Sequence, residues 1–255
     1  MRTLLRPIGF AITVVLLVFA VWETWWLIGW VNEQHALGVD LDYYKFIAQR
    51  WLDTGVWYTD RQLAGAYEQQ TLVDNLYPPH ALYLFLPWLW IPFPLWYLAP
   101  LGMLAYTIWR MRPKGWFWPV FALIAAWPKT PNAILYGNSD LWVLFFACAG
   151  VLWGWPGAIA TFKPSMAPFA LAGAHRKRYW VALGVIALAS LPQVQLWLLW
   201  PRVIDNSSST VEYSLAAMPM MTLPFIARLA ATTRPPIHLP DIVTRLRPRS
   251  TLARS

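Results

Sequence analysis

Apolar residues dominate the start of the chain, where residues 8–31 read IGFAITVVLLVFAVWETWWLIGWV. As a helix, this run of about 24 residues extends about 36 Å, more than the roughly 30 Å hydrocarbon core of a bilayer. It is too long for the core of a signal peptide, and no small-residue cleavage pattern follows it. The pattern therefore predicts an uncleaved transmembrane helix over residues 1–31. Arg2 and Arg6 precede it and favour a cytoplasmic N-terminus.

The longest polar stretch, residues 32–80, follows this helix and is predicted to be an external loop. Its segment DLDYYKFIAQRWLDTG places apolar and aromatic residues at helical spacing, namely Leu41, Tyr44, Ile47, Ala48, Trp51 and Leu52. These offsets form one stripe along a helix. They predict an amphipathic helix over residues 41–54, lying on the membrane surface and ending at Gly55.

From Ala81 the pattern is again mostly apolar, and residues 81–231 are predicted to form a membrane helical bundle. The expected segments are 81–97, 95–109, 116–127, 139–153, 155–174, 180–200 and 213–231. Several are short for a bilayer and contain proline, which favours broken or half-spanning helices and about seven to nine elements. The remainder, residues 232–255, is basic and is predicted to be a disordered cytoplasmic tail.

Composition supports the same class of protein. The chain is 58% hydrophobic and only 13% charged, with a mean hydropathy of +0.41. This balance predicts an all-α, polytopic, integral membrane protein. The net charge of +8 comes from short basic patches between apolar runs, so it does not indicate a nucleic-acid partner. The single cysteine, Cys148, lies in an apolar run and is expected to be buried.

Polar residues beside apolar segments are costly and therefore mark candidate chemistry. The first group is Asp40 with Asp42, just after the first helix. The second is DNLYPPH, which contains Tyr77 and His80. Taken locally, each has a structural explanation: an aspartate can cap the helix over 41–54, and the two prolines can fix the entry into the next helix.

Two further groups lie deeper in the apolar region. LYGNSDLW contains Asn138 at the mouth of an apolar helix, where Asn138 or Ser139 can serve as a cap. IATFKPSMAPF contains Lys163, which either extends to a surface or needs a partner or an anionic ligand. No His or Cys cluster suggests a metal site, no glycine-rich phosphate loop is present, and a requirement for a divalent metal stays open.

The order of these motifs resembles a known family. An Asp with Tyr four residues on (DLDYY), then YPP, GN and KP, over about residues 1–180, is similar to the GT-C class polyprenyl-phosphate-mannose-dependent mannosyltransferases, glycosyltransferase family 87, and to the related DUF2029 proteins. The resemblance implies a GT-C-like helical bundle in the plasma (inner) membrane, with its active site on the outer face. The family's usual GQ appears here as Gly137-Asn138.

The resemblance also implies roles for individual residues. Asp40 corresponds to the acidic catalytic residue, with Asp42 as the near alternative, and Lys163 to the lysine of KP. The implied substrates are a polyprenyl-phosphate-linked sugar, with mannose as the family's sugar, and a glycan or lipid acceptor.

The expected mechanism has Asp40 as general base and Lys163 holding the leaving phosphate, since a cation stabilises charge that develops there. Asn138, His80, Tyr44 and Tyr77 are predicted to bind the phosphate or the sugar; stacking on sugars is also considered for Trp57 and Tyr58. The hypothesis requires Asp40, His80, Asn138 and Lys163 to meet around one cavity. The alternatives are a transporter or flippase for a lipid-linked or anionic solute, and a non-catalytic subunit with a GT-C-like core.

Overall fold

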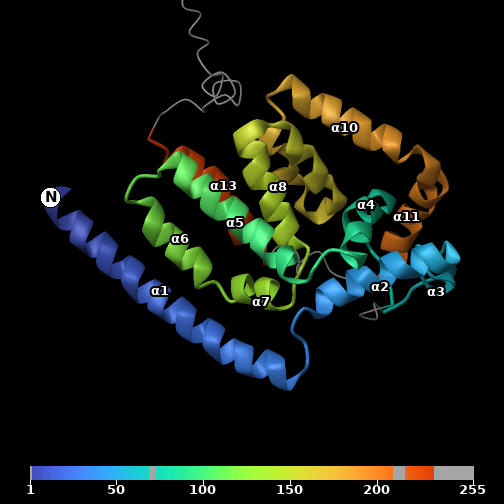
Figure 1. Ribbon diagram of the computed structural model, residues 1–255, viewed down its shortest axis with the longest axis horizontal. Coiled ribbons are helices and arrows are strands. Elements are labelled where there is room, and N and C mark those ends of the chain that lie inside the picture. Colours follow the sequence, from blue (N-terminus) through green and yellow to red (C-terminus); the bar gives the residue numbers. More distant parts are fainter. Residues whose placement is uncertain (1, 69–72, 209–215, 233–255) are drawn as a thin grey trace, which may run out of the picture.

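The computed structural model describes residues 2–68, 73–208 and 216–232, and these ranges are helical, with no β-strand among them. Helix α1 (Arg2–Glu33) runs along one edge of the molecule and packs against α6 (Phe117–Ala125) and α7 (Lys129–Leu135) (Figure 1). Its part Pro7–Glu33 is long and apolar enough to cross a membrane. The predicted first helix is therefore present and extends two residues beyond its expected end.

Helix α2 (Val39–Thr54) corresponds to the predicted amphipathic helix over residues 41–54 and is followed by α3 (Asp60–Ala64). It begins after Gly38, whose φ of 74° is left-handed, so neither aspartate is its N-cap. The predicted stripe is buried at Leu41, Tyr44, Ile47 and Ala48, whereas Leu52 is exposed. The buried residues of α2 belong to the main core, where the helix lies against α4 (Leu82–Phe85) and η2 (Leu86–Leu89).

Three pairs of helices would each be long enough to span a bilayer but are bent at a break. The first joins Pro79–Leu89 to α5 (Pro94–Met111) at 114°. The second joins α7 to α8 (Asp140–Trp153) at 105°, and the third joins α10 (Lys177–Ala189) to the segment Leu191–Asn206 at 46°. Prolines break the first and third, and Gly137 at φ 70° lies in the second break. Length and composition thus allow one span, or up to four if each bent pair counts as one.

The first bent pair is more divided than the expected segments 81–97 and 95–109. Its first half contains η1 (Pro79–Ala81), α4 (Leu82–Phe85) and η2 (Leu86–Leu89). The third pair ends with η6 (Leu191–Gln193) and α11 (Val194–Asn206), and α13 (Met218–Leu229) packs on α5, α6 and α8.

The apolar segment expected over residues 155–174 is a chain of short helices, as its prolines favoured. It comprises η3 (Trp155–Phe162), η4 (Pro164–Met166), α9 (Ala167–Ala170) and η5 (Leu171–Gly173). Pro156, Pro164 and Pro168 interrupt regular hydrogen bonding. The chain folds back on itself so closely that a methyl group on Gly173 would lie 1.9 Å from the Gly154 carbonyl oxygen.

The core surrounds α8, which is buried along most of its length and includes the predicted buried Cys148. Aromatic rings from distant segments pack beside it: Tyr44 stacks on Phe85 at 4.6 Å between ring centroids, and Trp96 lies 5.6 Å from Trp142. This core fixes the start of α2 beside the start of α8. The predicted tail, apart from Thr232, lies outside the described residues.

Candidate functional site

Two backbone hydrogen bonds join the start of α2 to the break between α7 and α8. Gly38 N–H donates to the Leu135 carbonyl at 2.8 Å, and Asp40 N–H donates to the Tyr136 carbonyl at 2.9 Å. Because these donors lie in the first turn of a helix, they would otherwise lack partners. The pairing therefore places Asp40 directly beside Asn138, although 98 positions separate them in the sequence.

The side chain of Asn138 connects the Asp40 carboxylate to the Lys163 ammonium. Its Nδ2 donates to Asp40 Oδ2 at 2.6 Å, and its Oδ1 accepts from Lys163 Nζ at 3.0 Å. The same Oδ1 accepts from the Asp140 backbone N–H at 3.0 Å, which begins α8. Asn138 Oδ1 thus accepts from both the first N–H of α8 and Lys163, and the orientation of the amide follows from its partners.

Asp140 is a fourth member of the cluster. Its Oδ1 lies 2.7 Å from Lys163 Nζ, and both side chains are buried. Asp140 was not among the site residues predicted from the sequence; a carboxylate at the start of an otherwise apolar helix is the signal that could have indicated a need for a cationic partner. The cluster therefore holds two carboxylates and one ammonium, with a formal charge of −1 when all three are ionised.

The electrostatic surroundings of Asp40 and Lys163 differ. Burial raises the pKa of Asp40, while the Asn138 hydrogen bond and the charge of Lys163 act in the opposite direction. Lys163 lies outside the candidate spans. Burial lowers the pKa of Lys163, but the Asp140 carboxylate and other nearby groups raise it by more, so the net shift is upward. Lys163 is therefore a fixed cation, whereas Asp40 has enhanced proton affinity for a carboxylate.

Tyr44 and Tyr77 both contact Ser139, the residue between Asn138 and Asp140. Their hydroxyls are 3.1 Å apart, and the Tyr77 hydroxyl lies 2.6 Å from Ser139 Oγ. The Ser139 N–H donates to the Tyr44 hydroxyl at 3.1 Å. Because Tyr44 is only 2% exposed, its observed contacts are those of a support for the start of α8.

Trp57 and Tyr58 also support this region. Trp57 Nε1 and the Tyr58 hydroxyl both donate to the Tyr77 carbonyl, at 3.2 and 2.9 Å. Both side chains are buried, so neither presents a ring face for stacking on a sugar in this structure. Asp42 is exposed and lies outside the cluster, and the geometry favours Asp40 over this near alternative.

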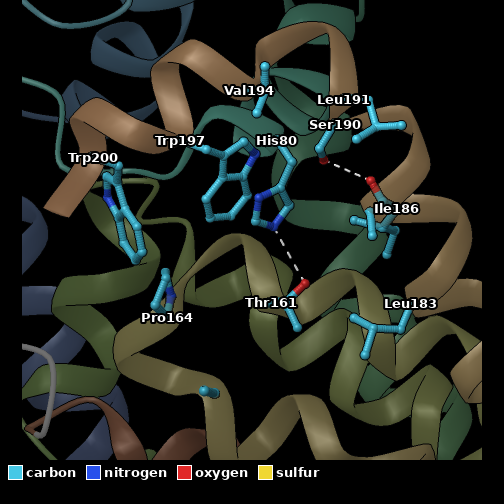
Figure 2. A pocket seen from close by; sticks show the side chains of 12 residues that line it. His80, Thr161, Pro164, Leu183, Ile186, Ser190, Leu191, Val194, Trp197 and Trp200 are labelled. Carbon is cyan, nitrogen blue, oxygen red and sulfur yellow. Dashed lines mark hydrogen bonds between the residues drawn. The ribbon is translucent and has the colours of Figure 1, made fainter.

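His80 lies in a different place from the one expected. It lines an apolar cavity of about 450 Å³ formed largely by α10, η6 and α11, and the lining includes none of Asp40, Asn138 and Lys163. Figure 2 shows its ring beside Trp197, with a centroid separation of 5.2 Å. His80 Nε2 lies 3.4 Å from Thr161 Oγ1. The structure thus brings Asp40, Asn138 and Lys163 together and places the His80 ring against Trp197 of α11, and a role of His80 in binding the donor stays a prediction.

The cavity nevertheless adjoins the segment that carries the lysine, since Thr161 and Pro164 line it on either side of Lys163 in sequence. Pro164 and Thr161 face the same space as His80 in Figure 2. The buried Nδ1 of His80 has no hydrogen-bond partner among the described residues. A short stretch of chain thus separates a polar cluster from an apolar cavity.

Within the described ranges, no group of three or more His, Cys, Asp or Glu side chains is arranged to hold a metal ion. Comparisons with family models, curated proteins and solved structures gave no match for this chain. The candidate site is therefore defined by its own geometry.

Proposed function

We propose that this chain is a multi-pass integral membrane glycosyltransferase that moves a sugar, mannose by the family resemblance, from a polyprenyl-phosphate donor to an acceptor hydroxyl of a glycan or lipid. The observation that carries the proposal is the meeting of Asp40, Asn138 and Lys163 from three distant segments. In this proposal the bent helix pairs are broken spans, the protein lies in the plasma (inner) membrane, and the site faces outward.

The chemistry assigned to Asp40 is that of a general base. Asn138 occupies Oδ2, while no described residue donates a hydrogen bond to Oδ1. Oδ1 takes the proton of the acceptor hydroxyl as that oxygen forms a bond to the anomeric carbon of the donor. The bond between the anomeric carbon and the phosphate oxygen breaks, and its electron pair stays on the phosphate. General-base assistance of this kind is worth roughly 10²- to 10⁴-fold in rate.

The chemistry assigned to Lys163 is stabilisation of the leaving phosphate. An ammonium has three N–H donors; Lys163 donates to Asn138 Oδ1, and its Nζ lies 2.7 Å from Asp140 Oδ1. A remaining N–H is assigned to a phosphate oxygen, on which negative charge grows as the sugar leaves. Asp140 then acts as a positioning residue, since it holds the ammonium in place before the donor binds.

The apolar cavity supplies a place for the lipid part of the donor. Its walls come from α10 and α11, whose other faces expose large apolar side chains such as Val185, Leu188 and Leu198. The cavity is therefore assigned to the hydrocarbon chain of the donor, because its lining is mostly apolar. His80 and Thr161 line it, and Thr161 lies two positions before Lys163, so the phosphate end of the lipid is assigned to this wall.

The test is transfer of radiolabelled mannose from polyprenyl-phosphate mannose to octyl α-mannoside by the purified full-length protein in proteoliposomes. Asp40→Asn removes the base with little change in shape, and we expect transfer to fall by at least about 100-fold. Asp42→Asn is the matched control, because Asp42 is exposed and outside the cluster. Wild-type transfer that survives Asp40→Asn removes Asp40 as the base, and an inactive wild type with this donor and with other lipid-linked sugars contradicts the proposal.

A second candidate function, transport of an anionic solute, is favoured by one observation. The α7–α8 pair is bent by 105° at a break that contains Asn138, and discontinuous helices of this kind form substrate sites in transporters. Uptake of inorganic phosphate or of a lipid-linked sugar into proteoliposomes, without change in the solute, separates this function from sugar transfer.

A further inference from the structure

Two glycines at the site make room for a hydroxyl that the sequence did not single out. Gly38 and Gly137 have φ values of 74° and 70°, and each precedes a site residue by one or two positions. A methyl group on Gly137 would lie 2.8 Å from the Tyr97 hydroxyl, and one on Gly38 would lie 3.2 Å from it. The Tyr97 hydroxyl thus rests against both segments that carry the candidate catalytic groups.

Tyr97 is held there from α5. Its ring packs on Phe93 at 5.1 Å between centroids, and the Phe93 ring closes over Gly38. One residue earlier on α5, Trp96 Nε1 donates to the Gly137 carbonyl at 2.8 Å. The first turn of α5 is therefore fixed to the floor formed by the two glycines, so the hydroxyl has a defined position.

The Tyr97 hydroxyl is buried, yet no described residue forms a hydrogen bond with it. Leaving a buried hydroxyl unpaired costs free energy, and an unpaired group in a native structure calls for an explanation. Asp40 follows Gly38 by two positions at the start of α2, so the hydroxyl lies beside the segment that carries this carboxylate. Among the described residues, Asp40 Oδ1 thus lacks a donor and the Tyr97 hydroxyl lacks an acceptor.

We infer that Tyr97 is a substrate-binding residue, whose hydroxyl donates a hydrogen bond to the acceptor sugar oxygen that Asp40 deprotonates. A sugar hydroxyl can donate to Asp40 Oδ1 and accept from Tyr97 at the same time, so one oxygen satisfies both groups. The oxygen keeps a second lone pair for its bond to the anomeric carbon. This inference rests on the proposed function and specifies how the acceptor is oriented.

The experiment compares Tyr97→Phe with wild type in the full-length protein. Tyr106→Phe is the matched control, because Tyr106 lies on the same helix and is exposed. The first measurement is thermal unfolding without substrate. Because the hydroxyl has no partner in the protein, we expect Tyr97→Phe to leave the melting temperature unchanged or to raise it. A lowered melting temperature means that the hydroxyl supports the fold, and it overturns the inference.

The second measurement is steady-state transfer with octyl α-mannoside as acceptor. We expect kcat/KM for the acceptor to fall about tenfold in Tyr97→Phe, the size of one lost hydrogen bond, with the KM for the donor unchanged. Wild-type kinetics in Tyr97→Phe overturn the inference while leaving the proposed function intact.

The inference remains testable if the wild type transfers no sugar, an outcome that counts against the proposed function. Binding of radiolabelled octyl α-mannoside is then compared between wild type and Tyr97→Phe below the critical micelle concentration. Binding to wild type that weakens in Tyr97→Phe, but not in Tyr106→Phe, supports the role of Tyr97. Equal binding, or no binding to either protein, overturns it.

Discussion

The Asn138 amide donates to the Asp40 carboxylate at 2.6 Å, across 98 positions of sequence. The same amide accepts from Lys163, so one neutral side chain holds the Asp40 carboxylate and the Lys163 ammonium in a fixed relation. An amide suits this position because it offers donors on one side and an acceptor on the other.

Replacing Asn138 should change the pH dependence of transfer. Burial raises the pKa of Asp40, and the Asn138 hydrogen bond partly offsets this. Asn138→Ala removes the offset, so the pKa of Asp40 should rise further. A base acts only when ionised, and activity is lost as the pH falls through its pKa. We therefore expect the acidic limb of kcat/KM to move to higher pH in Asn138→Ala and to stay in place in Asp42→Asn. An unmoved limb in Asn138→Ala means that another group sets it.

Separating the buried ion pair should cost more stability than removing both charges. Lys163 and Asp140 are 8% and 3% exposed, and their charged atoms lie 2.7 Å apart. Lys163→Met leaves the buried Asp140 carboxylate without its cation, which should lower the free energy of unfolding by about 3–5 kcal/mol. The double variant, Lys163→Met with Asp140→Asn, should recover part of this loss, because both charges of the pair are removed.

A double-mutant cycle in chemical denaturation measures the coupling between the two residues. Additive losses contradict the ion pair. The double variant should remain inactive in transfer, since it lacks the cation assigned to the phosphate. Recovery of stability without recovery of activity therefore separates the structural effect of Lys163 from its assigned role in chemistry.

Packing of the segment that carries Lys163 depends on Gly173. A methyl group there would lie 1.9 Å from the Gly154 carbonyl oxygen, so Gly173→Ala must displace backbone. We expect a loss of about 1–3 kcal/mol or more, as found for overpacking of a core. Gly184→Ala is the control, because its methyl group would meet nothing within 4 Å and lies within helix α10. The control should stabilise the protein by up to about 1 kcal/mol through helix propensity. Equal melting temperatures for the two variants would contradict the observed packing.

Filling the apolar cavity should displace lipid without touching the polar cluster. Ala187 lines the cavity, whereas Leu188 is 67% exposed and does not. Ala187→Trp should reduce the polyprenyl phosphate that copurifies with the protein, and Leu188→Trp should not. Mass spectrometry of extracted lipid measures the amount per protein. If the two variants retain equal amounts, the lipid chain lies elsewhere.

Local sequence patterns predicted the helices well where one spacing rule governs a long segment. The first apolar run predicted α1, and the period of apolar residues predicted α2 with its end at Gly55. Over residues 155–174 they predicted an apolar segment that its prolines could break, but not how its short helices fold against one another. Close approach of Gly150, Gly157 and Gly173 decides that region, and such approach is not visible in hydrophobic periodicity.

The sequence by itself determined the all-helical class, the apolar first helix and the polar residues that needed partners, because these depend on composition and on neighbours a few positions away. Only the tertiary structure decided which partners those residues have. It paired Lys163 with Asp140, placed His80 in a separate apolar cavity, and set the Tyr97 hydroxyl over two glycines. The physical reason is that side-chain contacts between distant segments follow from how helices bend and pack, and a one-dimensional pattern does not specify those bends.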